Sequence, residues 1–236
     1  MPTLSIVTTS TQRPYAFAQC QDYLARQSIV ADKLYLVGED HTDYHPRLGQ
    51  IVVKRKVKKN EKLHSLCLNW LAVLPKLDTD YIAVFEDDDW FRPDYLKTMV
   101  DMLLTGASLV GLQNALYYNV RQRRFQKLHN QNHASLTNTA FTKECLPLLE
   151  KVCKHNDVFL DYQMWLEHTG TKAMRDNLEN MDKPISIGIK GMPGVGGCGS
   201  FHGHPLGSID WGGNRLRDWI GGQDNERYAH LFETYH

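Results

Sequence analysis

The sequence has few cysteines and no pattern among them. The cysteines number five in 236 residues and no C-x-x-C pair occurs, the positions being Cys20, Cys67, Cys145, Cys153 and Cys198. An odd number at wide spacing excludes a disulfide framework and argues against a zinc site built on cysteine. We therefore expect reduced thiols, as in the cytoplasm.

The sequence also lacks a long apolar run and an excess of charge of either sign. No segment of ~20 apolar residues occurs, which argues against a membrane-spanning helix. The 27 basic residues balance the 27 acidic ones, so the chain as a whole has no electrostatic attraction to nucleic acid or membranes. The first residues read directly as a strand and leave no room for a signal peptide. We expect a soluble cytoplasmic protein, in a bacterium or in a host cell if the source is viral.

The first hundred residues alternate between short apolar runs and amphipathic stretches. Strands are predicted at 4–9, 33–37, 50–57 and 81–85, and helices at 14–27, 61–76 and 92–104. This alternation is typical of a largely parallel sheet with crossover helices. Longer, more antiparallel strands are then predicted at 107–120 and 124–128, helices at 141–153, 157–168 and 214–235, and a short strand at 184–189. Without repeats or a long linker, the simplest interpretation is one domain with two lobes.

Four consecutive acids follow the apolar run at 81–85, namely Glu86, Asp87, Asp88 and Asp89. The predicted strand places them at the carboxyl edge of the sheet, where open α/β sheets bind ligands. Neighbouring carboxylates raise one another's pKa unless a countercharge is present. A divalent cation supplies that charge, and oxygen ligands suit Mg²⁺ or Mn²⁺. The segment therefore predicts a metal–nucleotide site, the alternative being solvated acids in a strand-to-helix turn.

The segment Val84–Leu96, which reads V-F-E-D-D-D-W-F-R-P-D-Y-L, resembles the DXD region of family 2-like glycosyltransferases with the GT-A fold. Residues 6–14 resemble the opening strand and T-x-N-R turn of that family, residues 36–43 its second strand and acidic turn, and residues 66–71 its a-R-N-x-g helix. The resemblance implies an α/β GT-A fold with a mostly parallel central sheet and a small antiparallel acceptor-side lobe. It divides the single domain, 1–236, into a nucleotide-sugar-binding half (1–106) and an acceptor-side half (107–236).

The same resemblance implies how a nucleoside-diphosphate-sugar is bound with Mn²⁺ or Mg²⁺. Asp88 would be the main metal ligand, Asp87 would lie nearer the ribose, and Asp89 nearer the donor sugar or the metal. Thr8, Thr9 and Arg13 belong to the first turn, which lies against the nucleotide in the family.

Two departures from the family pattern concern the donor site. Gly38 and Glu39 stand where paired aspartates are usual, so Glu39 or Asp40 must contact the base or ribose. Asn69 occupies the family's helical Asn position, but Leu68 replaces the Arg before it. This replacement removes the usual phosphate contact from that helix.

A second acidic pair, Asp157 and Asp161, is four residues apart and shares one face of a predicted helix. Asp157 is explained as a helix cap or dipole partner. Asp161 is expected mid-helix among apolar and aromatic side chains, where a solvated acid is out of place. Because inverting members of the family carry a general base on a helix in this part of the chain, the resemblance implies Asp161 as the base that takes a proton from an acceptor hydroxyl. A structural acid bonded to nearby backbone is the alternative.

Residues 191–213 are rich in glycine and predict a flap over the donor. Three of the glycines match G-x-G-x-x-G, but no helix follows, so a dinucleotide site is not predicted. Related transferases use a loop of this region to contribute a His to the metal, which makes His202 or His204 a metal ligand by resemblance. Lys190 and Arg215 are the expected diphosphate contacts.

The leading functional prediction is a metal-dependent, inverting glycosyltransferase that moves a hexose or pentose to a hydroxyl acceptor. A sugar-nucleotide nucleotidyltransferase is an alternative, although residues 8–14 lack the glycine- and basic-rich phosphate loop with which such enzymes usually begin. A noncatalytic nucleotide- or glycan-binding protein is another, and it would make no use of Asp161.

A saccharide or glycoconjugate is the favoured acceptor, and a hydroxymethylated pyrimidine in viral DNA is next. For DNA, the basic stretches 54–59 and 121–124 would contact the phosphate backbone, and Tyr117, Tyr118 and Trp211 would stack a flipped base. Solvated surface is the more ordinary explanation of both basic stretches. The oligomeric state is not predicted.

Overall fold

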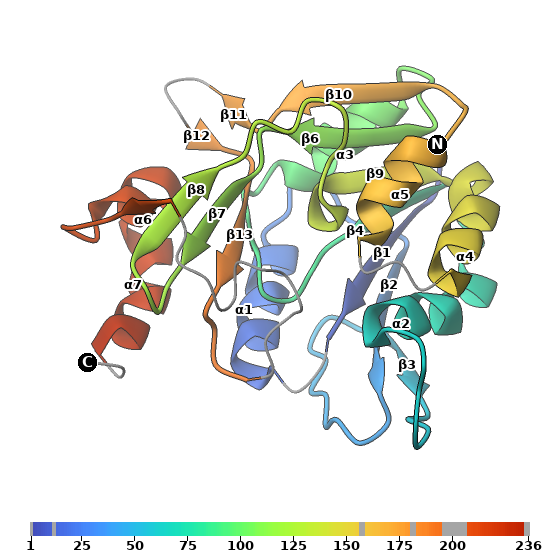
Figure 1. Cartoon of the computed structure of the whole chain (residues 1–236), viewed down its shortest axis with the longest axis horizontal. Helices are drawn as coiled ribbons and strands as arrows, with labels where there is room; N and C mark the ends of the chain where they lie inside the picture. Colours follow the sequence, from blue (N-terminus) through green and yellow to red (C-terminus); the bar gives the residue numbers. More distant parts are fainter. Residues whose placement is uncertain (1, 11–12, 156–158, 180–182, 195–206, 234–236) are drawn as a thin grey trace.

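The structure, a computed structural model, describes residues 2–10, 13–155, 159–179, 183–194 and 207–233 (Figure 1). Its centre is a seven-stranded sheet in the order β10-β6-β9-β4-β1-β2-β3. The strands are β1 (Leu4–Thr9), β2 (Lys33–Glu39), β3 (Ile51–Arg55), β4 (Tyr81–Val84), β6 (Leu109–Gln113), β9 (Thr139–Thr142) and β10 (Lys172–Asp176). Neighbouring strands pair in parallel except at β9, which is antiparallel to both β4 and β6. The carboxyl ends of β1, β2, β3, β4 and β6 therefore meet at one edge.

A second, smaller sheet has five strands in the order β14-β8-β7-β13-β5. They are β5 (Trp90–Phe91), β7 (Leu116–Asn119), β8 (Arg124–Lys127), β13 (Ser186–Lys190) and β14 (Ser208–Ile209), with a two-stranded ribbon of β11 (Leu178–Glu179) and β12 (Lys183–Pro184) beside them. All its pairs are antiparallel except β7 with β13. The expected second lobe is present, and β5 joins it to the acidic segment because Trp90 directly follows Asp89.

The helices divide into two groups that cover opposite faces of the large sheet. The first face packs against α1 (Pro14–Ala25), α3 (Tyr95–Leu103), the small sheet, α6 (Asn214–Ile220) and α7 (Gly222–Glu233), whereas the second packs against α2 (Ser65–Val73), α4 (Leu146–Lys154) and α5 (Leu160–Glu167). Successive strand residues serve the two faces in turn, Ile6 facing the first and Val7 the second, as the period of a strand requires. Among the described helices, none is long and apolar enough to cross a membrane.

Three expected elements are placed differently by the structure. The strand expected at 107–120 breaks at Asn114, whose φ of 57° turns the chain out of the large sheet (β6) into the small one (β7). The helix expected at 141–153 starts only at Leu146, because residues 139–142 form the buried strand β9. The helix expected at 214–235 is two helices, since Gly221 at φ 84° ends the first.

Two further differences are smaller. The helix expected from residue 61 begins at Ser65, where the His64 ring accepts the backbone N–H of Leu66 at 3.4 Å as a cap. The strand β10 was not predicted, because the residues of Lys172–Asp176 do not alternate regularly between apolar and polar side chains. Neither difference moves the carboxyl edge on which the acids lie.

Candidate active site

The polar residues predicted to bind a donor gather where β1, β2 and β4 end. Val7 of β1 is in register with Val84 of β4, and Thr9 with Val37 of β2. Ser10, Glu39 and the four acids therefore emerge side by side from three adjacent parallel strands. This is the edge at which open α/β sheets bind ligands.

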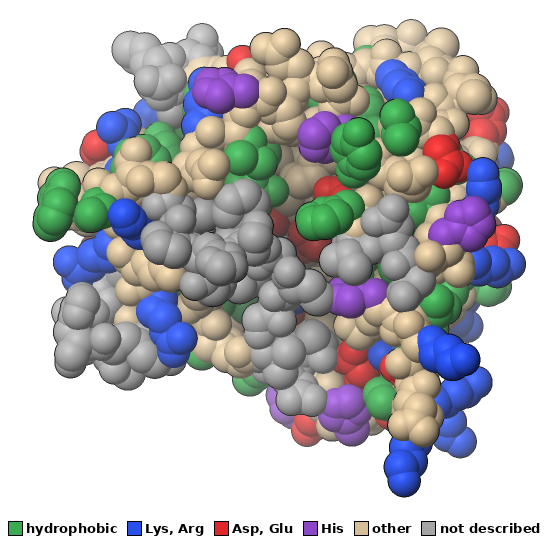
Figure 2. Space-filling model, in the orientation of Figure 1, with side chains coloured by type: hydrophobic (Ala, Val, Ile, Leu, Met, Phe, Trp, Pro, Cys, Tyr) green, Lys and Arg blue, Asp and Glu red, His purple; other side chains and the backbone are tan. Residues whose placement is uncertain are grey.

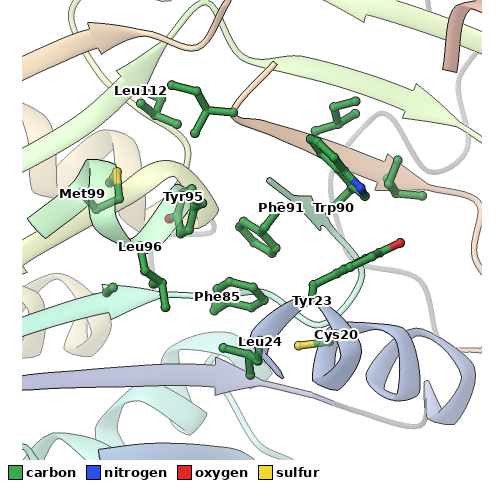
Figure 3. Close-up of a cluster of buried hydrophobic side chains, with 14 of the residues drawn as sticks. Cys20, Tyr23, Leu24, Phe85, Trp90, Phe91, Tyr95, Leu96, Met99 and Leu112 are labelled. Atoms are coloured by element: carbon green, nitrogen blue, oxygen red, sulfur yellow. The ribbon is translucent and has the colours of Figure 1, made fainter. Parts of the chain in front are cut away.

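Buried aromatic rings hold the acidic segment at both ends (Figure 3). Phe85 precedes the four acids and Phe91 follows them after Trp90, and the two phenyl rings stack with centroids 3.7 Å apart. Tyr95 packs against both rings and donates its hydroxyl to the carbonyls of Val84 and Thr137. The segment is thus a short loop closed by a stacked pair, so its carboxylates are fixed by hydrophobic packing.

Two cations from distant segments pair with the acids. The Arg13 guanidinium lies 2.5 Å from Asp87 Oδ1 and 2.7 Å from Asp88 Oδ2. The Lys190 ammonium lies 3.3 Å from Asp89 Oδ1 and 3.6 Å from Asp88 Oδ2. Asp88 therefore sits between the two cations, as the central member of the triplet.

Asp87 and Asp89 also accept hydrogen bonds from neutral groups. The Ser10 hydroxyl donates to Asp87 Oδ2 at 2.6 Å, and the backbone N–H of Ile189 donates to Asp89 Oδ1 at 3.0 Å. Sequence reasoning did not find Ser10. Ser10 could have been proposed from its position, because it directly follows the buried strand β1, which ends at this edge of the sheet.

The acids carry more charge than the two cations neutralise. Burial raises the pKa of Glu86, and the charges of Asp89 and Asp88 raise it further. Burial also raises the pKa of Asp87 and of Asp89, although Arg13 and Lys190 respectively oppose the rise. Among the described side chains four carboxylates face two cations; with all four ionised the excess is two negative charges, which protons or one divalent cation can neutralise.

Asp88 and Asp89, the expected metal ligands in the described part of the chain, both pair with cationic side chains in this structure. Within the described ranges, no three His, Cys, Asp or Glu side chains converge as they would around a metal ion. Asp88 and Asp89 are oxygen donors of the kind that Mg²⁺ and Mn²⁺ prefer, and the cluster has the matching excess of charge. Asp88 and Asp89 are therefore two oxygen donors suited to a divalent cation, and in this structure their charged partners are Arg13 and Lys190. His202 and His204 lie outside the described residues.

Glu39 and Asn69, both expected to contact the nucleotide, meet at a buried arginine. Arg55 donates to Asn69 Oδ1 at 2.9 Å and pairs with Glu39 Oε1 at 3.2 Å and Glu61 Oε1 at 2.5 Å. The sequence analysis treated Arg55 as part of a solvated basic stretch, but its side chain is only 9% exposed. The other oxygen of Glu39, Oε2, is buried without a hydrogen-bond partner among the described residues.

The other first-turn and second-turn candidates differ in burial. Thr8 and Thr9 are buried within β1, whereas Asp40 is exposed and accepts the backbone N–H of Val57 at 3.4 Å. Arg215 lies over the rings of Phe125 and Trp219, at 5.2 and 5.9 Å from the ring centroids.

Asp161 is in the first turn of α5 and not in the middle of a helix, because α5 starts at Leu160. Its Oδ2 accepts the backbone N–H of Leu136 at 3.2 Å. Burial raises the pKa of Asp161, and the nearby charge of His133 opposes that rise. The raised pKa of this half-buried carboxylate agrees with a general base, and its bond to the Leu136 backbone agrees with the alternative of a structural acid. Asp157 lies outside the described residues.

Tyr117 lies beside Lys190, and its hydroxyl is within electrostatic reach of both Asp89 and Asp161. Its ring lies 5.7 Å from the Lys190 ammonium, and burial raises the pKa of its hydroxyl to about 12 while Lys190 lowers it and Asp89 and Asp161 raise it. Gly188 makes room for the ring, since a Cβ there would lie 2.4 Å from Tyr117 Cδ1. Sequence reasoning considered Tyr117 only for stacking a DNA base, together with Tyr118. Tyr118 is fully buried and donates to Asp210, which is incompatible with stacking.

The space-filling view agrees with this arrangement. Figure 2 shows acidic side chains at the bottom of a hollow near the middle of the face, beside hydrophobic and histidine side chains. Basic side chains project at the lower end of the same view, and the lysines 54, 56, 58 and 59 on and after β3 are exposed.

The fold is shared with solved glycosyltransferase structures. S. aureus TarS 1–349 aligns with a TM-score of 0.55 and 10% identity over 79% of this chain and 60% of that one. The same protein in complex with UDP-GlcNAc gives 0.54 and 12%, over 79% and 58%. Mannosyltransferase PcManGT from Pyrobaculum calidifontis, in complex with GDP-Man and Mn²⁺, gives 0.54 and 13%, over 81% and 57%. The chain spans about three fifths of these structures, and its architecture is the GT-A fold.

The sequence itself identifies the family. The model of glycosyl transferase family 2 matches residues 9–178, which is more than half of the chain. The protein therefore belongs to glycosyl transferase family 2. A comparison with curated proteins found no match.

Proposed function

We propose that this chain is a metal-dependent, inverting glycosyltransferase that moves a sugar from a nucleoside-diphosphate-sugar to a hydroxyl acceptor. The observation that carries the proposal is the acid cluster, fixed at the carboxyl edge and short of two positive charges. A diphosphate cannot approach four carboxylates unless cations lie between them. Arg13 and Lys190 already lie there, and Asp88 and Asp89 would hold a divalent cation.

The donor would lie along the ends of β1, β2 and β4. Oε2 of Glu39 has no hydrogen-bond donor among the residues that the structure describes, and the N–H of a uracil or guanine ring would supply one. Arg13 and Lys190, which pair with the acids, would also contact the diphosphate, so that Lys190, from the half beyond residue 106, would contribute to the donor site. PcManGT with GDP-Man and TarS with UDP-GlcNAc support a donor of this class.

The metal, when bound, would neutralise the leaving nucleoside diphosphate, so that no proton is needed on the departing oxygen. Asp161 would accept the proton of the acceptor hydroxyl. The acceptor oxygen would form the new bond to the anomeric carbon while the bond between the anomeric carbon and the diphosphate oxygen breaks. The electron pair of the broken bond would leave with the diphosphate. One displacement of this kind inverts the anomeric centre.

We further propose a reducing location such as the cytoplasm, because Cys20, Cys67, Cys145 and Cys153 are all buried thiols outside any disulfide. Free thiols persist in that compartment.

A thermal-shift screen tests the donor half of the proposal. A nucleotide-sugar that binds the folded state raises the melting temperature by mass action, and we expect such a rise with Mn²⁺ but not with a chelator. Asp88→Asn should abolish the rise, and Asp161→Asn should retain it and lose turnover, measured as nucleoside diphosphate release. Asp101→Asn, on the exposed side of α3, is the matched control and should behave as wild type. No metal-dependent rise with any nucleotide-sugar would refute the proposal.

A further inference from the structure

Exposed apolar side chains lie at the start of α5 and along it. Phe159, Tyr162 and Leu166 are 61%, 49% and 62% exposed. Phe159 is the residue before the first turn of α5, and Tyr162 and Leu166, four residues apart, lie on one face of the helix. They are three of the ten large hydrophobic side chains exposed in the described part of the chain. Such a concentration marks an interaction site, unlike isolated surface residues. We call these three residues the α5 platform.

The α5 platform is continuous with the candidate base. The His133 ring meets the Tyr162 ring edge-on, with centroids 5.2 Å apart and an interplanar angle of 88°. His133 also lies close enough to Asp161 for its charge to act on that carboxyl group. Because Leu136 N–H holds Oδ2 of Asp161, the carboxylate is fixed beside the two rings. In Figure 2, hydrophobic and histidine side chains border the hollow on the side where α5 lies in Figure 1.

We propose that the α5 platform binds the acceptor, and that the acceptor is a glycan whose terminal pyranose packs against Tyr162 and directs a hydroxyl to Asp161. This inference rests on the proposed function and assigns its acceptor class. A pyranose has an apolar face of C–H groups, which suits the electron-rich face of an aromatic ring, and an edge of hydroxyls. A wholly apolar partner would bury Asp161 and His133 without hydrogen bonds, which is costly.

Acceptor kinetics test the inference. Nucleoside diphosphate release is measured with the donor found by thermal shift, using methyl glycosides of glucose, galactose, mannose and N-acetylglucosamine and disaccharides of these sugars. At least one should accelerate release above the rate of donor hydrolysis. Tyr162→Ala should raise the acceptor KM roughly tenfold, while Tyr162→Phe keeps the ring and should retain it. Leu104→Ala, a 58% exposed apolar residue elsewhere, should leave it unchanged.

The donor provides the internal control. The donor KM and the donor-induced thermal shift should be equal in all four proteins, since Tyr162 is placed on the acceptor side. Two results would show that the inference is wrong while the proposed function stands. In the first, the donor binds and is hydrolysed but no glycoside accelerates nucleoside diphosphate release. In the second, Tyr162→Ala responds to glycosides like wild type. Acceleration by an oligonucleotide containing 5-hydroxymethylcytosine, and not by glycosides, would also overturn it. Absence of donor binding would contradict the proposed function itself.

Discussion

Replacing Lys190 by methionine should destabilise the protein in the absence of metal and make its stability depend on Mn²⁺. The Lys190 ammonium lies 3.3 Å from Asp89 Oδ1 and 3.6 Å from Asp88 Oδ2, and its side chain is only 11% exposed. Burial lowers the pKa of Lys190, but Asp88 and Asp89 raise it above its ordinary value, so the lysine is charged at neutral pH. Methionine keeps most of the length and removes the charge.

The expected loss follows from these distances. With an effective dielectric constant of about 20, each pair contributes about 5 kcal/mol of Coulomb attraction. Desolvation of the buried ammonium offsets much of this attraction, and removing one member of a buried pair typically costs about 3–5 kcal/mol. Because the carboxylates left behind can take up protons, we expect the lower end, about 3 kcal/mol, at neutral pH.

Urea denaturation followed by tryptophan fluorescence measures this change in the free energy of unfolding. Lys97→Met is the matched control, since Lys97 pairs with Asp101 on an exposed helix face and should cost less than about 1 kcal/mol. Mn²⁺ should restore part of the loss in Lys190→Met, by about 2.7 kcal/mol at a hundredfold excess over its Kd.

Two results would refute the reasoning. If Lys190→Met is no less stable than Lys97→Met in chelator, the ion pairs with Asp88 and Asp89 do not stabilise the fold. If it is less stable but Mn²⁺ restores nothing, the excess charge of the cluster does not bind a divalent cation.

Three further predictions concern the pH response and two packing contacts. Because a base must be deprotonated to act and burial raises the pKa of Asp161, kcat/KM should fall toward acid at a pH above the ordinary carboxyl value of 3.8; a pH profile that is flat down to that value would contradict this. Gly188→Ala would put a Cβ 2.4 Å from the Tyr117 ring and should cost about 1–3 kcal/mol in urea denaturation together with a loss of turnover, so wild-type behaviour in both would disprove the assigned contact. Asp224→Ala should lower stability by about 2–3 kcal/mol, since Asp224 accepts Trp90 Nε1–H at 2.6 Å and pairs with Arg26 at 2.6 Å; an unchanged denaturation midpoint would show that these contacts add nothing.

The position of the acids could be predicted from the sequence because it depends on local pattern. A short apolar run followed by Glu86 and three aspartates specifies a buried strand and the edge at which it ends. The flanking Phe85 and Phe91 also signal burial, although their stacking depends on the fold. Local pattern did not predict β9, a four-residue strand that lies just before the helix α4. An apolar run of that length is compatible with a strand or with the start of a helix.

The counter-ions could not be predicted, because they come from far along the chain. Arg13 is 75 residues from Asp88, and Lys190 is 101 residues from Asp89. Resemblance placed both near the phosphates but did not indicate that they pair with the acids. Tyr117 was missed as a link to Asp161 for the same reason, since only the pairing of β7 with β13 brings it beside Lys190.

These long-range pairs explain how a cluster of acids can be buried before any ligand arrives. Without Arg13 and Lys190, folding would bring four carboxylates together with no counter-ion, and their desolvation would oppose the fold. With both, the carboxylates still outnumber the cations, and the raised pKa values of Glu86, Asp87 and Asp89 mean that protons can relieve the excess charge. In the proposed function, a donor diphosphate accompanied by a divalent cation would supply positive charge to the acids and negative charge to the two bases. The site would then be complementary to the metal–diphosphate pair as a unit, and each partner alone should bind more weakly than the two together.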